Sequence, residues 1–190
     1  RIAFEEAEML SRLGVKVTLI SSKQYMLRRV DQDARDLIIK NLIDTGVEVI
    51  DEYDEIIFES HTIRVTKAQQ TTIVRPQYCI LAMGYVVDDS LFGPVVIQTN
   101  KEGISTNEFC QSSINHIYAI GDANDKLKLS NVAIKEGQIA ANHILGRQMG
   151  IDYNGFVSGI MGVYEYSCLG LTEEVIREKG IPYFPYSLTL

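Results

Sequence analysis

The chain has few of the features that assign a protein to a class at once. Its 190 residues include three cysteines, and Cys79, Cys110 and Cys168 are too widely spaced for a C-x-x-C pair, a metal-ligand set or a disulfide framework. We therefore predict no metal site, and three unpaired cysteines favour a reducing cytoplasm. No apolar run reaches the roughly 18 residues that a membrane span needs. Residues 1–6 have no secretory signal layout.

An excess of positive charge is also absent. With 18 lysines and arginines against 25 aspartates and glutamates, the net charge is −7, which argues against nucleic acid or an anionic membrane as the main partner. Internal repeats and low-complexity tracts are missing as well. The hydrophobic content of 46% is enough for a folded core, and the length allows one large domain or parts of two or three.

The first 50 residues alternate between helical and strand patterns. Residues 2–13 place apolar side chains on one face of a helix that Gly14 ends, and residues 15–20 form a β-branched strand. Residues 31–45 predict a second helix, capped by Asp31 and ended by Gly46, before a strand at 47–50. Helix–glycine–strand units of this kind build a parallel sheet covered by helices.

The pattern changes between residues 55 and 77, where three short strands joined by tight turns predict a small antiparallel sheet inserted into the alternating pattern. Residues 78–83 then read as a buried strand closed by Gly84, with Cys79 as a small buried hydrophobic residue.

Residues 114–122 are the most informative stretch, because an apolar strand runs directly into Gly121-Asp122. In open α/β folds, ligands bind at the carboxyl ends of the strands. Gly121 would let the backbone approach a ligand closely, and Asp122 could accept hydrogen bonds from a sugar hydroxyl. A Gly-Asp turn is also common at strand ends, so the pair by itself does not distinguish a binding site from a turn or a helix cap.

Three segments in order resemble motifs of the flavoprotein pyridine nucleotide–disulfide oxidoreductases, the family of dihydrolipoyl dehydrogenase, glutathione reductase and mercuric reductase. They are Ile2-Ala3-Phe4-Glu5, residues 105–122 and residues 165–173. In that family, the aspartate at the position of Asp122 binds the ribityl chain of FAD, and the following helix points its amino end at the flavin. The resemblance thus implies an FAD site that comprises Asp122, Gly121, Ala123, Leu129 and Ser130.

The resemblance also implies an NAD(P) site near the start of the chain. Ala3 and Glu5 match the tail of the nucleotide loop G-x-G-x-x-[GA]-x-E, and Gly84 closes the strand at 78–83. The end of the second strand contacts the adenosine ribose in such folds, where an acid favours NAD and cations favour NADP. Here that position holds Ser21, followed by Ser22 and Lys23, which favours NADPH or weak discrimination.

The implied fold is α/β and divides into three parts. Residues 1–86 would form an incomplete Rossmann-like NAD(P)-binding domain with the inserted antiparallel hairpin region. Residues 87–149 would form the second half of an FAD-binding domain, and 150–190 the beginning of an α+β dimerisation domain. By this resemblance the chain is the central fragment of a longer enzyme. It has no redox-active cysteine pair and no catalytic residue, so we expect it to be inactive alone.

The function implied for the full-length protein is that of an FAD-dependent oxidoreductase resembling dihydrolipoyl dehydrogenase. It would pass electrons between NAD(P), FAD and a disulfide or dithiol substrate such as a lipoyl group, as a cytoplasmic homodimer. Two alternatives remain open. A soluble pyridine nucleotide transhydrogenase or NAD(P)H oxidase uses the same scaffold, and a non-catalytic binding remnant is a hypothesis of another class. The chain departs from the family pattern at 85–88 and at Ser130-Asn131, which suggests a divergent member.

Overall fold

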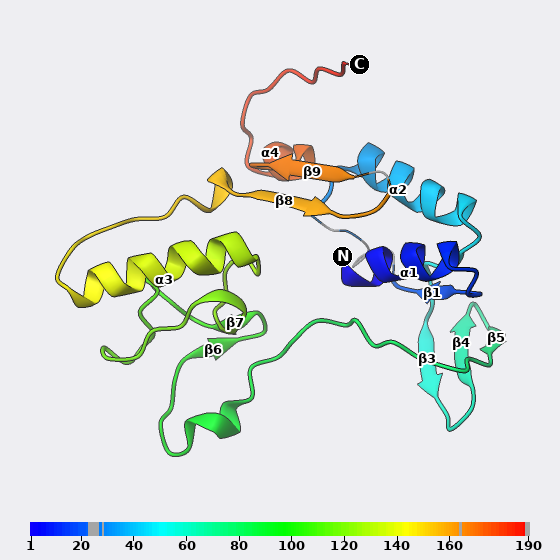
Figure 1. The fold of residues 1–190 in the computed structure, drawn as a ribbon, viewed down its shortest axis with the longest axis horizontal. Helices are drawn as coiled ribbons and strands as arrows, with labels where there is room; N and C mark the ends of the chain where they lie inside the picture. The colour runs from blue at the N-terminus through cyan, green and yellow to red at the C-terminus, as the bar shows by residue number, and fades with distance from the viewer. Residues whose placement is uncertain (23–26, 28, 164, 189–190) are drawn as a thin grey trace. The chain divides into compact units, whose positions relative to one another are not determined.

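The computed structural model describes residues 1–22, 27, 29–163 and 165–188. These residues form two compact units, one of residues 1–82 with 159–190 and one of residues 83–158 (Figure 1). The predicted α/β class is confirmed. The three domain boundaries remain a prediction, and each unit is described by itself.

The first unit begins with the predicted alternation. Helix α1 (Ile2–Arg12) leads to strand β1 (Thr18–Ile20), and helix α2 (Gln32–Asp44) leads to strand β2 (Glu48–Ile50). Both helices end before a glycine in the left-handed region, Gly14 at φ +83° and Gly46 at φ +93°, as the sequence predicts. Strands β1 and β2 are parallel, with Leu19 opposite Val49.

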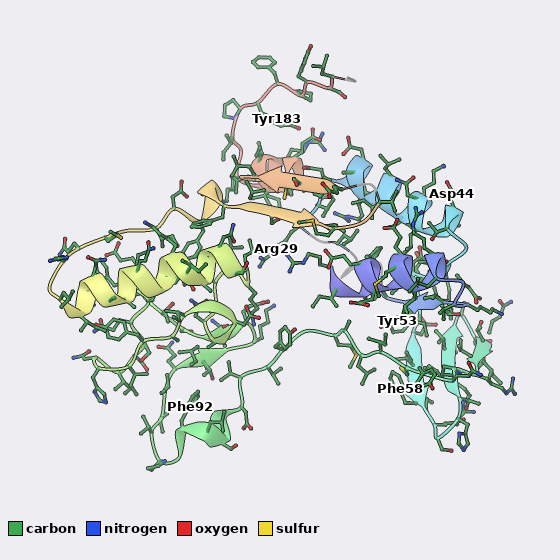
Figure 2. The ribbon with its side chains drawn as sticks, viewed as in Figure 1. Arg29, Asp44, Tyr53, Phe58, Phe92 and Tyr183 are labelled. Carbon is green, nitrogen blue, oxygen red and sulfur yellow. The ribbon has the colours of Figure 1, made fainter. Side chains whose placement is uncertain are left out.

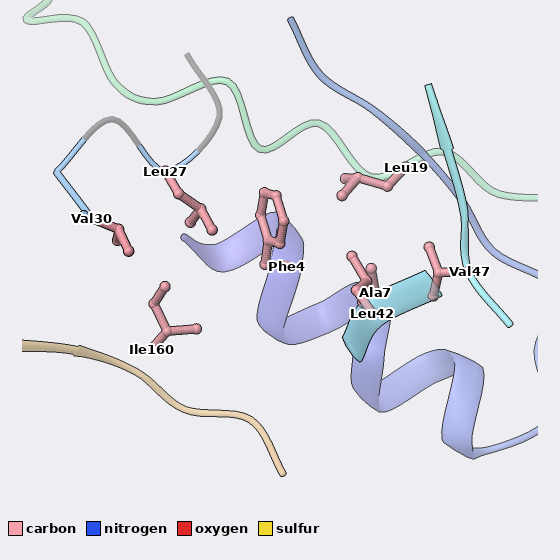
Figure 3. Packing of buried hydrophobic residues seen from close by; sticks show 8 residues of the cluster. All are labelled: Phe4, Ala7, Leu19, Leu27, Val30, Leu42, Val47 and Ile160. Carbon is pink, nitrogen blue, oxygen red and sulfur yellow. The ribbon is translucent and has the colours of Figure 1, made fainter. Parts of the chain in front are cut away.

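The core of this unit lies between these elements and the end of strand β8 (Val157–Ile160). Figure 3 shows Phe4 and Ala7 of α1 close to Leu19 of β1 and Leu42 of α2. Each of these four side chains is at least 92% buried, because the apolar face of each helix turns toward the sheet. Other buried members of the core are Leu27, Val30, Val47 and Ile160.

An antiparallel three-stranded sheet follows, in the order β3-β4-β5, as predicted for this region. Its strands are β3 (Glu55–Phe58), β4 (Ile63–Lys67) and β5 (Gln70–Val74). Only one face of the central strand is buried, since Ile63 and Val65 point inward.

The last part of the first unit contains strand β9 (Tyr166–Leu169), which pairs with β8, and helix α4 (Glu173–Glu178). Thr172 caps α4, because its hydroxyl accepts a hydrogen bond from the Val175 N–H. Beyond α4, Tyr183, which is labelled in Figure 2, donates a hydrogen bond to Glu173.

The second unit is built on one long helix, α3 (Ser130–Ile144), which matches the predicted position. A two-stranded hairpin, β6 (Thr99–Asn100) with β7 (Gly103–Ile104), precedes it. Three short 3₁₀ turns complete the unit: η1 (Asp89–Phe92), η2 (Gly121–Ala123) and η3 (Tyr153–Gly155). Its apolar cluster joins Cys110 to Ile139 and Ala140 of α3.

Two predicted buried strands are wrong in this structure. Residues 78–83 have no strand pairing, and Tyr78 and Met83 are 91% and 81% exposed. Cys79 is therefore exposed, not buried as predicted. Residues 117–120 form a single antiparallel bridge, between Tyr118 and Gln111, instead of a strand. The physical reason is shared: an extended segment becomes a sheet strand only where another strand offers its backbone groups, and none in the described residues lies beside these two.

Among the described residues, no helix combines the length and apolar character required to cross a membrane.

Candidate functional site

The turn η2 has the backbone conformation that the Gly-Asp pair suggested. Gly121 is buried with φ +62°, in the left-handed region where a side chain is strained. A Cβ atom built on Gly121 would lie 3.1 Å from the Cβ of Ala133 in α3. The next two residues, Asp122 and Ala123, are exposed. The turn thus packs its glycine against α3 and directs the following carboxylate outward.

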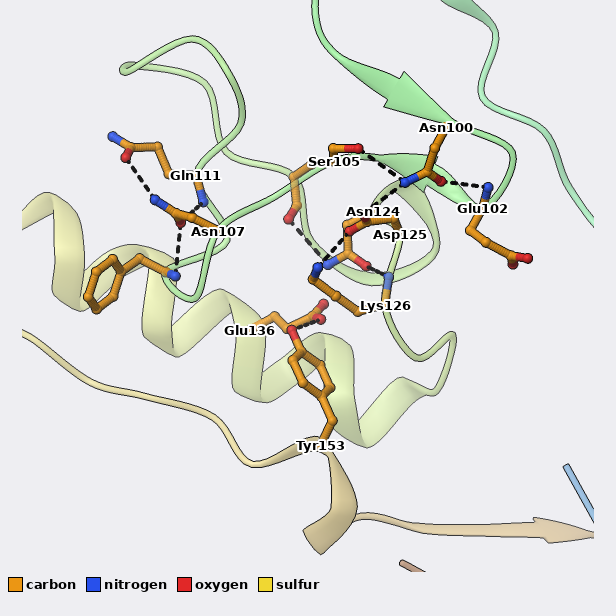
Figure 4. A network of polar contacts seen from close by, with 12 residues as sticks. Asn100, Glu102, Ser105, Asn107, Gln111, Asn124, Asp125, Lys126, Glu136 and Tyr153 are labelled. Atoms are coloured by element: carbon orange, nitrogen blue, oxygen red, sulfur yellow. Dashed lines mark hydrogen bonds and ion pairs between the residues drawn. The ribbon is translucent and has the colours of Figure 1, made fainter. Parts of the chain in front are cut away.

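Two fully buried polar side chains, Glu136 and Asn124, stabilise this turn, and both are labelled in Figure 4. Glu136 of α3 accepts a hydrogen bond of 2.6 Å from the Gly121 N–H, and its other oxygen accepts one of 2.9 Å from the Tyr153 hydroxyl. Asn124 anchors the other end of the turn, where its carbonyl oxygen accepts the Lys126 N–H at 2.9 Å. Its amide also approaches the Ala119 carbonyl at 3.4 Å.

The amino end of α3 follows this turn in the chain. Leu129 is the N-cap and makes no side-chain cap hydrogen bond, while Ser130 is exposed in the first turn. The side chain of Asn131 bonds locally, its oxygen accepting the Val132 N–H at 2.9 Å. The first amides of a helix carry a partial positive charge, so this end favours an electron-rich ligand group. Among the FAD-site residues that the sequence predicts, Gly121 thus lies in contact with the helix that Ser130 begins.

A second polar cluster stabilises the loop beside η2. Asn100 of β6 donates hydrogen bonds to Ser105 at 3.1 Å and to Asp125 at 3.0 Å, and Lys126 pairs with Asp125 at 3.0 Å. Burial alone would raise the pKa of Asp125, but the hydrogen bonds from Lys126 and Asn100, together with the charge of Lys126 and the Thr106 N–H, lower the pKa below its usual value. This cluster ties the β6–β7 hairpin to the residues that follow Asp122.

The predicted NAD(P) residues at the start of the chain lie on α1. Ala3 is partly buried, and Glu5 in the first turn accepts a hydrogen bond of 2.9 Å from the Met161 N–H. One turn later, Glu8 accepts the Val163 N–H at 3.2 Å and also pairs with Arg12. Glu5 is therefore engaged by the segment after β8, which a simple solvated helix carboxylate would not be.

The other predicted nucleotide residues are only partly placed. Ser21 and Ser22 follow β1 and are partly buried, and the Ser21 N–H donates a 2.9 Å hydrogen bond to the Ile50 carbonyl. Gly84 is exposed with φ +93° and belongs to the second unit. Lys23 lies outside the described residues. Within the residues that the structure describes, no group of three or more His, Cys, Asp or Glu side chains could hold a metal ion.

Sequence reasoning missed Glu136, Asn124 and Tyr153. A signal for Glu136 was present, because residues 132, 136, 139 and 140 form one buried stripe of α3 in which only position 136 is charged. A carboxylate on such a stripe must find hydrogen-bond donors, and this marks it for attention. Nothing local in the sequence identifies Tyr153 as the second donor.

The parallel β1–β2 pair with its helices and the glycine turn before α3 are features of α/β folds that bind nucleotides. The model of the pyridine nucleotide-disulphide oxidoreductase family matches residues 1–137. The chain belongs to this family.

The known relatives agree. The chain is 29% identical over 187 residues to a dihydrolipoyl dehydrogenase of Bacillus subtilis, covering 93% of this chain and 39% of the relative. It is 26% identical over 190 residues to the soluble pyridine nucleotide transhydrogenase of Sodalis glossinidius, covering 96% and 40%. The crystal structure of LpdA from Mycobacterium tuberculosis has the same fold, with a TM-score of 0.76, 23% identity, and coverage of 94% of this chain and 40% of that one. The chain thus spans about two fifths of the length of these relatives.

Proposed function

We propose that the full-length protein is an FAD-dependent oxidoreductase of the dihydrolipoyl dehydrogenase type, which passes electrons between NAD(P), FAD and a dithiol or disulfide. The observation that carries this proposal is the turn η2. Its buried, left-handed glycine is bonded to α3 and followed by the exposed carboxylate of Asp122.

The residues of the second unit fit a flavin nucleotide. Asp122 offers a carboxylate that can accept hydrogen bonds from the hydroxyls of a ribityl chain. Gly121 lacks the side chain that would fill the space against Ala133, and Leu129 and Ser130 begin a helix with no side-chain cap. When bound, FAD would supply the two-electron chemistry, and the chain would bind and orient it.

The first unit fits a nicotinamide nucleotide less completely. Ala3 and Glu5 lie in the first turn of α1, and Ser21 and Ser22 lie at the carboxyl end of β1, where a parallel sheet receives an adenosine ribose. Ser21 and Ser22 stand directly after β1, where NAD-specific folds have an acid, so we propose NADPH use or weak discrimination.

We propose a disulfide or dithiol, such as a lipoyl group, as the substrate. The similarity to a transhydrogenase supports a second candidate on the same scaffold, which needs no disulfide. A cysteine pair spaced C-x-x-x-x-C elsewhere in the full-length protein would favour the disulfide reductase, and the absence of such a pair would favour the transhydrogenase.

Assembly and location are further parts of the proposal. Phe184 and Tyr186 are 97% and 86% exposed in the segment after α4. Aromatic side chains are enriched in interfaces, which supports a homodimer whose interface includes this segment. The three free cysteines support a cytoplasmic location.

The direct test is the substitution Asp122→Ala in the full-length protein, with Glu108→Ala as a control that removes an exposed carboxylate elsewhere in the second unit. Hydrogen bonds to a charged group contribute about 1.5–3 kcal/mol, so the dissociation constant for FAD should rise by roughly 10- to 150-fold in Asp122→Ala. Titration of apoprotein with FAD, followed by flavin fluorescence, measures it. An equal affinity for FAD in Asp122→Ala and Glu108→Ala would show that Asp122 does not bind the cofactor.

A further inference from the structure

Glu136 is a carboxylate without exposure to solvent in the middle of α3. A buried charge is costly unless hydrogen bonds compensate for it. Here each oxygen has a donor, because the Gly121 N–H lies 2.6 Å from one and the Tyr153 hydroxyl lies 2.9 Å from the other (Figure 4). The side chain thus joins three segments of the second unit: α3, the turn η2 and the turn η3.

The Gly121 N–H has special importance because of its position in the chain. It belongs to the peptide between Ile120 and Gly121, which enters the turn one residue before Asp122, so fixing this peptide fixes the backbone from which the Asp122 side chain leaves. Gly121 has φ +62°, which glycine adopts about as readily as a negative φ, so contacts such as the one to Glu136 select this conformation among those open to it. Glu136 supplies the only side-chain acceptor described for this amide.

Tyr153 keeps Glu136 in place. Burial, together with the hydrogen bond to Glu136, raises the pKa of Tyr153 above its usual value, so its hydroxyl remains protonated and serves as a donor. With one oxygen fixed by Tyr153, the other is directed at Gly121.

We propose that Glu136 is a positioning residue for the flavin site, which holds the Gly121 peptide so that Asp122 presents its carboxylate to the bound FAD. This inference rests on the proposed function. Glu136 does not touch the cofactor; it acts through the Gly121 N–H. Tyr153 supports it from the linker after α3.

Two substitutions at this position separate hydrogen bonding from charge. Glu136→Gln keeps an oxygen that can accept the Gly121 N–H and an amide that can donate to the Tyr153 oxygen. Glu136→Leu keeps the approximate volume and removes the acceptor. Ile139→Val is the matched control, because Ile139 is equally buried one turn later on α3 and makes no bond to η2.

The experiment uses the full-length protein and measures three quantities for each variant: the FAD dissociation constant, the visible circular dichroism of bound flavin, and the thermal midpoint of the apoprotein. We expect Glu136→Leu to weaken FAD binding by at least about 10-fold, equivalent to about 1.4 kcal/mol, and to alter the flavin dichroism. Glu136→Gln and Ile139→Val should remain within about threefold of the wild type. Affinities are compared at a temperature well below every midpoint, so that loss of folding does not contribute.

Tyr153→Phe is a second variant that keeps the proposal testable if Glu136→Leu does not fold. It should weaken FAD binding severalfold, and when both fold the double variant should bind no worse than Glu136→Leu alone, since the two residues act in one chain. Unchanged FAD affinity in Glu136→Leu, or equal losses in Glu136→Leu and Ile139→Val, would overturn the proposal. With Glu136→Leu unfolded, unchanged affinity in Tyr153→Phe would do the same. A wild-type protein that binds no FAD would instead overturn the proposed function on which this one rests.

Discussion

At the scale of single residues, Gly121 is under two constraints at once. Its φ of +62° disfavours any side chain, and a Cβ would approach Ala133 to 3.1 Å. Gly137 lies four residues after Ala133 on α3 and is under neither constraint. Its geometry is helical, and an added Cβ would meet only the Ile120 side chain, at 3.6 Å. The same substitution should therefore have opposite effects at the two positions.

We expect Gly121→Ala to lower the free energy of unfolding by about 1–3 kcal/mol, because an alanine there takes a left-handed conformation. Gly137→Ala should raise it by about 0.5–1 kcal/mol, since alanine has the higher helix propensity. Urea unfolding of both variants of the full-length protein measures the difference. A Gly121→Ala protein as stable as the wild type would show that the turn has another conformation.

Cys110 is fully buried, and this burial, with a smaller contribution from the charge of Glu136, raises the pKa of its thiol to about 11. A folded-state pKa above the unfolded value means that the folded protein holds the proton more tightly. The contribution to stability is then complete below pH 9 and is lost as the pH rises toward 11.

The free energy of unfolding should accordingly fall by about 2 kcal/mol between pH 9 and pH 11 through Cys110. Cys110→Ala lacks this titration, so its stability should depend less steeply on pH over the same range, whatever its absolute stability. Denaturant unfolding at a series of pH values gives both slopes. Parallel curves for the two proteins would show that Cys110 has an ordinary pKa.

The candidate site could be predicted in part at this scale. Gly121-Asp122 stands out because an apolar run, a glycine and an acid are adjacent in the chain. The partners that fix the turn are distant in sequence: Glu136 comes 15 residues after Gly121, and Tyr153 comes 17 residues after Glu136. Such contacts depend on packing that no local pattern encodes.

At the scale of elements, Asp31 shows how tertiary structure changes a local role. The sequence predicts that its side chain caps α2, yet no such hydrogen bond forms. The carboxylate instead accepts the Glu173 N–H at 2.7 Å, at the start of α4, more than 140 residues away. The predicted side-chain cap of α2 is wrong because a helix end brought close by folding offers a competing donor.

Asp31→Ala should therefore destabilise α4 more than α2, at a cost of about 1–2 kcal/mol for the lost cap. Hydrogen exchange of the Glu173 amide should quicken while the first turn of α2 changes little. Asp33→Ala removes a similar charge from the first turn of α2 and is the matched control. Faster exchange confined to α2 in Asp31→Ala would contradict the assignment.

The elements themselves were predicted with uneven success. Helices α1 and α2 were located from apolar spacing and glycine ends, because a helix satisfies its own backbone, and the start of α3 was implied by the family resemblance. The strands expected at 78–83 and 117–120 need neighbours to become strands, and an apolar pattern alone does not supply them.

At the scale of the whole molecule, the match to the family model includes parts of both units. The family model spans residues 1–137, which include α1 and β1 of the first unit and the turn η2 of the second. The proposed electron transfer requires both cofactors, so the central claim concerns the full-length protein.

An anaerobic titration of that protein with NADPH and with NADH, followed by visible absorbance, tests this claim most directly. The account predicts bound flavin, its reduction by either nucleotide, and a long-wavelength charge-transfer band between a thiolate and the flavin. NADPH should be at least as effective as NADH, in keeping with Ser21 and Ser22 after β1. Reduction without that band would favour the transhydrogenase or oxidase alternative, and a protein with no flavin spectrum that binds no added FAD would contradict the account.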